Sequence, residues 1–224
     1  MSEPVSEVYL LDCIEGMKKY PDKYFDLAIV DPPYGINHSQ IAGKQSGEKY
    51  GNAAAAKRDY KIKDWDKEPP SNLYFIELFR ISKNQIVWGA NHFISRMPYD
   101  ASGWIVWDKD NGNNNFADCE LAYSSFNKAV RKFKYTWNGM IQQNMKDKED
   151  RFHPTQKPVA LYDWIFKNYA QQGFKILDTH MGSQSSRIAA HKAKLDYVGF
   201  EIDAEYFDAG NKRFNDYKKQ LKLF

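Results

Sequence analysis

The segment Asp31-Pro32-Pro33-Tyr34 combines the groups needed to bind and activate a flat amine. Two consecutive prolines hold the backbone extended and remove two N–H donors, which leaves the Pro32 carbonyl directed outward beside a carboxylate. If Asp31 and this carbonyl each accept one hydrogen of an amino group, the nitrogen moves toward the tetrahedral form that can attack a methyl group. Tyr34 would hold the ring by its face. The segment therefore predicts a site for the exocyclic amino group of a nucleobase.

Carboxylates follow three short apolar runs of the kind that forms buried parallel strands. Asp31, Asp178 and Glu201 each come directly after such a run. In an open α/β sheet the ligand binds outside the carboxyl ends of the strands, so these side chains should meet in one crevice. For one acid taken alone, a helix cap or turn residue is the alternative. Their joint occurrence predicts a ligand site at that edge of the sheet.

Several segments together resemble the amino-group DNA methyltransferases, which use S-adenosylmethionine. Asp31–Tyr34 resembles their four-residue signature, and Asp178–Ser186 resembles their glycine-containing cofactor loop. Tyr197–Asp203 is similar to the next strand with its ribose-binding acid, and His153–Pro158 to the segment before the cofactor loop. Leu10–Cys13 resembles the strand and acid that meet the adenine of the cofactor. Because the catalytic signature comes first and the cofactor loop last, the chain resembles the permuted beta class.

The resemblance implies a role for each matching residue. Glu201 would accept hydrogen bonds from the ribose diol, Asp12 from the adenine amino group, and Lys157 would offer positive potential to the cofactor carboxylate. The alternatives are a solvated surface lysine for Lys157 and a loop-packing histidine for His153. The implied catalytic residues are Asp31, Pro32, Pro33 and Tyr34. The implied cofactor-binding residues are Asp12, Cys13, Asp31, His153, Gln156, Lys157, Asp178, His180, Gly182, Ser183, Gln184, Ser185, Glu201 and Ile202.

Two residues of the cofactor loop depart from the family pattern. His180 stands where the family usually has an aromatic residue, and Gln184 where it has a second glycine. Glycine permits positive φ and close backbone approach, so a glutamine either adopts a costlier conformation or narrows the space for the cofactor. We therefore expect somewhat weakened cofactor binding rather than its loss.

The implied activity is methylation of adenine N6 in double-stranded DNA. Asp31 favours adenine, because the cytosine members of the family more often carry serine there. A cytosine-N4 enzyme and a catalytically weak nucleic-acid-binding relative of the same fold are the alternatives. A methyltransferase for glutamine side chains of proteins is disfavoured by Asp31 and by the order of the motifs. A base inside a duplex cannot reach such a pocket, so we expect it to be flipped out.

A basic segment offers candidate contacts to DNA phosphates. Its cations have no acid between them, and aromatic residues are interleaved with them, as in surfaces that combine phosphate contact with stacking. The alternative is a solvated strand or loop with the aromatic rings packed beneath it. A homodimer, or a restriction or specificity partner, is left open. The predicted DNA-binding residues are Lys128, Arg131, Lys132 and Lys134.

Strands alternating with helical patterns must position these residues. This order predicts an α/β fold, a doubly wound, mostly parallel, Rossmann-like sheet of the seven-stranded methyltransferase type with helices on both faces. We expect a single domain over residues 1–224, with a mobile loop at about 35–70 and a small target-recognition region at about 111–152. The expected strands are Phe25–Val30, Gln85–Trp88, Trp104–Trp107, Phe174–Leu177 and Tyr197–Phe200. The expected helices are Asn72–Ile81, Pro158–Ala170, Ser185–Ala193 and Ala204–Tyr217.

Composition excludes several other classes of protein. The formal charge is +3, from 32 basic against 29 acidic residues, so any nucleic-acid surface must be local. The 2 cysteines and 5 histidines include no pair at zinc-ligand spacing, and we expect no metal. There is no signal-peptide pattern and no apolar run near the roughly 20 residues that span a bilayer. We expect a cytoplasmic protein, bacterial or phage-encoded, without membrane association.

Overall fold

The centre of the molecule is a twisted sheet. The structure is a computed structural model that describes residues 3–36, 63, 66–112, 117–138 and 141–221. Within these residues the main sheet has eight strands in the order β1-β10-β9-β2-β3-β5-β4-β6, and β7 and β8 form a separate hairpin. The strands are β1 (Ser6–Leu10), β2 (Phe25–Val30), β3 (Ser82–Trp88), β4 (Ile105–Asp108), β5 (Cys119–Ser124), β6 (Arg131–Lys134), β7 (Trp137–Asn138), β8 (Ile141–Gln142), β9 (Lys175–Asp178) and β10 (Asp196–Glu201).

Most neighbouring strands run parallel. The pairs from β1 through β10, β9 and β2 to β3 are all parallel, β5 is antiparallel to both β3 and β4, and β6 is parallel to β4. The carboxyl ends of β2, β9 and β10 therefore lie side by side at one edge. The predicted mostly parallel α/β sheet is confirmed, with β6 as an added edge strand beyond the seven-stranded type.

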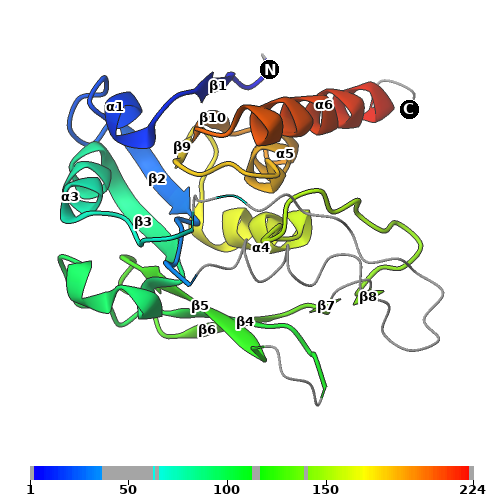
Figure 1. Cartoon of the computed structure of the whole chain (residues 1–224), viewed down its shortest axis with the longest axis horizontal. Helices are drawn as coiled ribbons and strands as arrows, with labels where there is room; N and C mark the ends of the chain where they lie inside the picture. The colour runs from blue at the N-terminus through cyan, green and yellow to red at the C-terminus, as the bar shows by residue number, and fades with distance from the viewer. Residues whose placement is uncertain (1–2, 37–62, 64–65, 113–116, 139–140, 222–224) are drawn as a thin grey trace.

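Helices cover both faces of this sheet, as Figure 1 shows. Alternate residues of a strand point to opposite faces, and β2 supplies both cores in this way. Leu27 and Ile29 pack in the core that includes α4 and α5, whereas Ala28 and Val30 pack in the core that includes α3. The helices are α1 (Cys13–Met17), α3 (Asn72–Ile81), α4 (Val159–Tyr169), α5 (Ser185–Lys192) and α6 (Ala204–Leu221), with the short 3₁₀ turns η1 (Ala90–His92) and η2 (Ile94–Arg96).

Local signals place most of these elements. Ser71 caps α3, which has the predicted bounds, and the other long helices and inner strands begin and end within a few residues of their predicted limits. The pattern did not reveal α1, β5 or the strands at 131–142, where little periodicity was expected. Both β5 and β6 fall inside the region 111–152, so part of the predicted target-recognition region belongs to the central sheet. The predicted mobile loop at about 35–70 lies mostly outside the described residues.

Two further observations concern the described part of the chain. None of its helices has the length and apolar character needed to cross a bilayer. The same residues contain no group of three or more histidine, cysteine or acidic side chains that could hold a metal ion.

Candidate active site

The three predicted carboxylates occupy the carboxyl edge of adjacent strands. Asp31 follows β2, Asp178 ends β9 and Glu201 ends β10. Burial raises the pKa of Asp178 to about 7, and the nearby charges of Asp31 and Glu201 add to this, while a 2.5 Å hydrogen bond from the Ser186 hydroxyl opposes it. The three acids therefore stand at the carboxyl ends of neighbouring parallel strands, as the sequence predicted.

Asp31 is held by a donor on each oxygen. The Tyr34 hydroxyl donates to Oδ1 at 2.7 Å, and the Lys157 ammonium donates to Oδ2 at 2.5 Å. Lys157 also donates to the Tyr34 hydroxyl at 3.2 Å, which closes a triangle of side chains. The Lys157 side chain is only 4% exposed, so the surface-lysine alternative is wrong. That its ammonium offers positive potential to the cofactor carboxylate stays a prediction.

A second acid, absent from the sequence prediction, completes this group. Glu120 of β5 places Oε2 3.2 Å from the Lys157 ammonium and Oε1 2.5 Å from the ammonium of Lys109. Burial disfavours the charged acid, but the two ammonium groups outweigh it and lower the pKa of Glu120 to about 2. Burial raises the pKa of Asp31 against the pull of Lys157. We call Asp31, Lys157, Glu120 and Lys109 the charge cluster.

The Tyr34 ring is fixed by the turn that follows β3. It stacks on His92 of η1 with a centroid distance of 4.9 Å and an interplanar angle of 15°. A Cβ on Gly89 would lie 2.1 Å from the ring, so only glycine fits this turn, whose φ is +68°. The buried Asp66 carboxylate accepts from the backbone N–H groups of Tyr34 at 2.8 Å and Gly35 at 3.0 Å. His92 therefore occupies one face of the ring that was predicted to stack on a base.

Glu201 organises the backbone of the cofactor loop. Its carboxylate accepts from the N–H of Gly182 at 2.8 Å, of Ile202 at 3.0 Å and of Asp203 at 2.9 Å. Burial raises the pKa of Glu201, and these donors oppose the rise. Gly182 has φ +46°, and a Cβ there would lie 3.3 Å from Nε2 of His153. The loop is thus narrow on the side where His153 covers it.

Gln184 turns its side chain away from the loop. It has a φ of +59° at the start of α5 and is fully buried. Its Oε1 accepts from the Arg187 guanidinium at 2.9 Å, and its amide lies in a notch of α6 where Gly210 has no side chain. The expected costlier conformation is therefore present. The alternative, a narrowed cofactor space, is not supported by this packing, because the side chain lies against α6.

The residues near the amino end of the chain have local partners. Asp12 caps α1 by accepting from Ile14 N at 2.9 Å and Glu15 N at 3.1 Å, which is the helix-cap role considered for an acid after a strand. The Cys13 sulfur lies 3.9 Å from Nε2 of His180. Burial, with help from the Asp12 charge, raises the pKa of Cys13 to about 12, and burial lowers the pKa of His180 to about 4. This corner holds a neutral thiol beside a neutral imidazole.

The remaining predicted cofactor residues divide by their surroundings. Gln156 braces its own loop, accepting from Phe152 N at 3.3 Å and donating to the Asp150 carbonyl at 3.0 Å. A partly buried arginine of α6, Arg213, donates to the Ser183 carbonyl at 2.8 Å and to the Ser185 hydroxyl at 2.9 Å. Ile202, by contrast, is 65% exposed beside Glu201.

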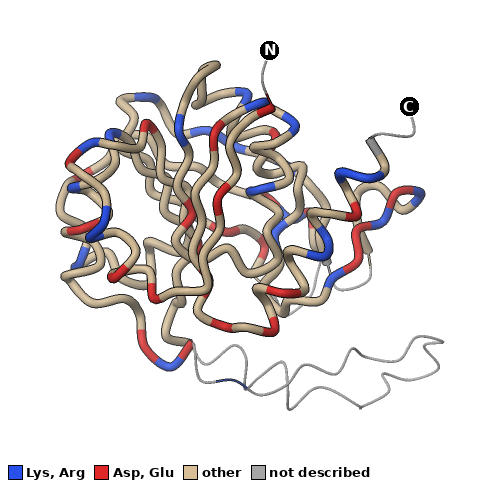
Figure 2. Tube along the Cα trace, turned by 90° about the horizontal axis from the view of Figure 1, so that it is seen from above, with Lys and Arg blue, Asp and Glu red and all other residues tan. Residues whose placement is uncertain are grey.

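Two of the predicted DNA-binding cations form ion pairs with acids that are distant from them in sequence. The parallel pairing of β6 with β4 brings Lys132 within 3.3 Å of Asp108, and Lys134 within 2.9 Å of Asp110. Lys128 donates to the Asn168 carbonyl at 2.8 Å. Figure 2 shows basic and acidic residues interspersed in the same way over much of the chain.

The aromatic residues of this segment pack inward. Phe133 stacks on Tyr135 at 5.6 Å and contacts Trp164 of α4 at 5.5 Å, and Trp137 is buried. Trp137 belongs to the core and the half-buried Phe133 and Tyr135 pack against it, which agrees with the alternative interpretation. Only the charges of this segment are left as candidate DNA contacts.

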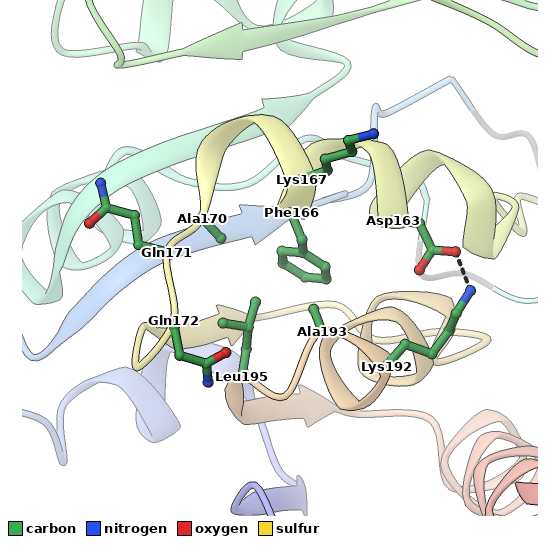
Figure 3. Close-up of a pocket in the computed structure, with 9 residues that line it drawn as sticks. All are labelled: Asp163, Phe166, Lys167, Ala170, Gln171, Gln172, Lys192, Ala193 and Leu195. Carbon is green, nitrogen blue, oxygen red and sulfur yellow. Dashed lines mark hydrogen bonds and ion pairs between the residues drawn. The ribbon is translucent and has the colours of Figure 1, made fainter.

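A separate cavity lies near the amino ends of β9 and β10, opposite the carboxyl ends where the acids stand. It has a volume of about 270 Å³ and is bordered by the segments that precede β9 and β10. Figure 3 shows Phe166 and Leu195 directed into it, with the Asp163–Lys192 ion pair at its rim. Since the carboxylates described above lie at the carboxyl ends of the strands, this cavity is not part of the candidate site.

Comparisons with known proteins agree with this geometry. The family of N6/N4 methyltransferases, described as DNA methylases, matches residues 74–212. The Type II methyltransferase M2.MboI of Moraxella bovis is 25% identical over 253 aligned positions, covering 96% of this chain and 89% of that protein. M.HinfI of Haemophilus influenzae is 24% identical, covering 92% of this chain and 67% of that protein.

Solved structures share the fold. The M1.HpyAVI–SAM complex superposes with a TM-score of 0.53 at 20% identity, covering 93% of this chain and 100% of that one. The cytosine-N4-specific PvuII DNA methyltransferase superposes with a TM-score of 0.60 at 11% identity, covering 97% of this chain and 93% of that one.

Proposed function

Because the chain belongs to the N6/N4 family of DNA methylases, we propose that it moves a methyl group from S-adenosylmethionine to the N6 amino group of an adenine flipped out of double-stranded DNA. The observation that supports this most strongly is the Asp31 carboxylate. It stands at the end of β2, oriented by Tyr34 and Lys157, at the same edge as the Gly182 loop and Glu201. Nucleophile activation and cofactor binding are thereby assigned to adjacent strands.

The residues of the cofactor loop fit S-adenosylmethionine. A carboxylate has about four lone-pair positions, so Glu201 can still accept from a ribose diol after binding its backbone donors. Gly182 lies beneath His153 with the positive φ that lets backbone approach a ligand closely. The exposed Ile202 side chain beside Glu201 offers an apolar surface for a flat ring. When bound, the cofactor supplies an activated methyl group on a sulfonium.

The chain's own residues then align and polarise the amino group. Asp31 accepts one of its hydrogens and the Pro32 carbonyl the other, which favours a tetrahedral nitrogen with an available lone pair. As the nitrogen–methyl bond forms, the sulfur–methyl bond breaks and the electron pair returns to sulfur. The methylated nitrogen carries a positive charge and loses one proton to Asp31 or to water. Alignment of donor and acceptor is the main contribution required of the protein.

The choice of adenine is supported by the acid at position 31, where serine is the more frequent residue in cytosine enzymes of the family. For DNA contact we propose Lys128, Arg131, Lys132 and Lys134 through phosphate attraction alone. The acids beside Lys132 and Lys134 reduce what these two contribute. We further propose that the segments at about 35–70 and 111–152 supply the contacts that read the target sequence.

The test is a methylation assay followed by mapping of the product. The protein is incubated with duplex DNA and S-adenosylmethionine, and single-molecule sequencing of DNA from an expressing host identifies the modified base and its sequence context. Asp31→Ala should abolish methyl transfer while calorimetry still detects cofactor binding. Asp163→Ala, at the far cavity, is the matched control and should retain activity. Turnover by Asp31→Ala would overturn the mechanism, and methylation at cytosine N4 would overturn the choice of base.

A further inference from the structure

The Lys157 ammonium is held by two hydrogen bonds and one ion pair. It donates to Asp31 Oδ2 at 2.5 Å and to the Tyr34 hydroxyl at 3.2 Å, and it forms an ion pair with Glu120 Oε2 at 3.2 Å. The rings of Trp88 and Tyr34 lie 5.5 and 5.7 Å from the nitrogen, so the ammonium is enclosed by acceptors and aromatic faces. An ion enclosed in this way can hold the carboxylate of Asp31 in a single orientation.

An ammonium so close to Asp31 also opposes the proposed reaction. The target nitrogen gains positive charge as it is methylated, and a neighbouring cation raises the energy of that state. Glu120 provides the compensating charge, since its carboxylate contacts the same ammonium from the side of β5. Lys109 in turn binds the second oxygen of Glu120 at 2.5 Å and fixes it in place. The four groups alternate in sign and sum to zero.

On the basis of the proposed function, we infer that Glu120 is a positioning residue for methyl transfer. It acts through Lys157, anchoring the ammonium that orients the Asp31 carboxylate and cancelling its charge beside the nucleophile. Lys109 serves Glu120 in the same indirect way. Neither residue lies in a segment that resembles a family motif, and both reach the site only because β4 and β5 pair next to β3.

The first arm of the test removes the charge of Glu120 while keeping its shape. Glu120→Gln leaves the cluster with one net positive charge beside the Asp31 carboxylate. At an effective dielectric constant of about 20, this gives a loss of roughly 10- to 100-fold in kcat. The KM for S-adenosylmethionine should change by less than about twofold, because the cofactor loop is untouched. Asp163→Asn, which removes the acid of a different lysine pair, is the matched control and should behave as wild type.

The second arm is the pH profile of kcat. The titratable groups that interact with this cluster from outside it are Tyr34, Tyr74 of α3, Tyr162 of α4 and Asp178 of β9. The charge of Glu120 raises the pKa of both Asp31 and Lys157. Glu120→Gln should therefore shift both the acidic and the basic limb of the kcat–pH profile to lower pH. Lys109→Met removes a positive charge and should shift both limbs to higher pH.

The double variant separates charge cancellation from a purely structural role. Lys109→Met combined with Glu120→Gln restores a neutral cluster, so it should recover most of the kcat that Glu120→Gln loses. If Glu120 only supported the packing of β5, a second lost contact would deepen the defect. A double variant no faster than Glu120→Gln, or a Glu120→Gln enzyme with wild-type kcat and profile, would overturn the inference.

Folding and basal activity are measured alongside these variants. Circular dichroism and calorimetric binding of S-adenosylmethionine establish that each variant is folded. If Glu120→Gln does not fold, the inference is tested with Lys109→Met and the charge-conserving Glu120→Asp. An unshifted kcat–pH profile in Lys109→Met then overturns the inference. A wild-type protein that methylates no DNA would instead count against the proposed function itself, so the two failures are distinguishable.

Discussion

Replacing Gly210 by alanine should destabilise the protein, although alanine is the better helix former. Gly210 is buried within α6, and a Cβ there would lie 2.6 Å from Cγ and Nε2 of Gln184. Gln184 is fully buried and bonded to Arg187, so it has no free space to move into. Helix propensity favours alanine by about 1 kcal/mol, whereas overpacking costs about 1–3 kcal/mol. We expect a net loss of up to about 2 kcal/mol.

Thermal and urea unfolding measure this loss. For a chain of this size, each kcal/mol corresponds to roughly 2–4 °C in Tm, so Gly210→Ala should lower Tm by several degrees. Asp208→Ala, at an exposed position of the same helix, is the control for helix propensity alone. A Gly210→Ala protein as stable as wild type would refute the steric argument.

A double-mutant cycle with Gln184 tests the cause directly. Gln184→Gly relieves a left-handed conformation worth about 1–2 kcal/mol but removes a buried hydrogen bond to a guanidinium worth about 1.5–3 kcal/mol. In that background alanine at position 210 has room, and it should stabilise by about 1 kcal/mol instead of destabilising. Additive effects of the two changes would show that the side chains do not compete for the same space.

The same variant tests the expectation of weakened cofactor binding. Since the Gln184 side chain packs against α6, Gln184→Gly should leave the Kd for S-adenosylmethionine within about threefold of wild type. A tenfold tighter Kd would show that glutamine does narrow the cofactor space.

Three further outcomes are expected elsewhere in the molecule. Burial raises the pKa of Asp178 to about 7. Its contribution to stability is therefore complete below about pH 4 and is lost as the pH rises through 7. Asp178→Asn should remove this pH dependence, which is measured by comparing Tm at pH 5 and pH 8. Because burial raises the pKa of Cys13 to about 12, a thiol reagent at pH 8 should modify the exposed Cys119 first, as mass spectrometry of the labelled protein would show. Lys132→Ala should weaken duplex binding less than Arg131→Ala in a titration at low salt, because the Lys132 ammonium already pairs with a carboxylate.

Sequence patterns predicted those parts of the site that neighbouring residues build. Glu201 and Gly182 belong to adjacent turns whose backbone groups bond to each other, and such turns have recognisable composition. The strand before Asp31 ends in four consecutive apolar residues, so its end could be located within a residue. These elements depend on local propensity and burial, which a short window of sequence contains.

Residues that enter the site from distant segments could not be predicted in this way. Glu120 looks like one acid in a short polar stretch until β5 pairs between β3 and β4. Lys157 could be placed in a motif, but its burial depends on Glu120 and Asp31, which are remote in sequence. The acids that pair with Lys132 and Lys134 could not be predicted for the same reason, because they belong to a different part of the chain, at and after the end of β4.

The site thus has one part built by residues close in sequence, around Glu201, and one built by residues from distant segments, around Asp31. The two parts should respond differently to substitution. Around Glu201 the contacts are mainly to backbone N–H groups, so changes there alter the shape of the cofactor loop and should act on cofactor affinity. Around Asp31 the contacts are between side chains from separate segments, and in the proposed reaction their charges would act on the target nitrogen. Substitutions in the charge cluster should therefore act on kcat and its pH dependence. This division follows from which groups supply the hydrogen bonds, since backbone donors persist when a side chain changes and charged side chains do not.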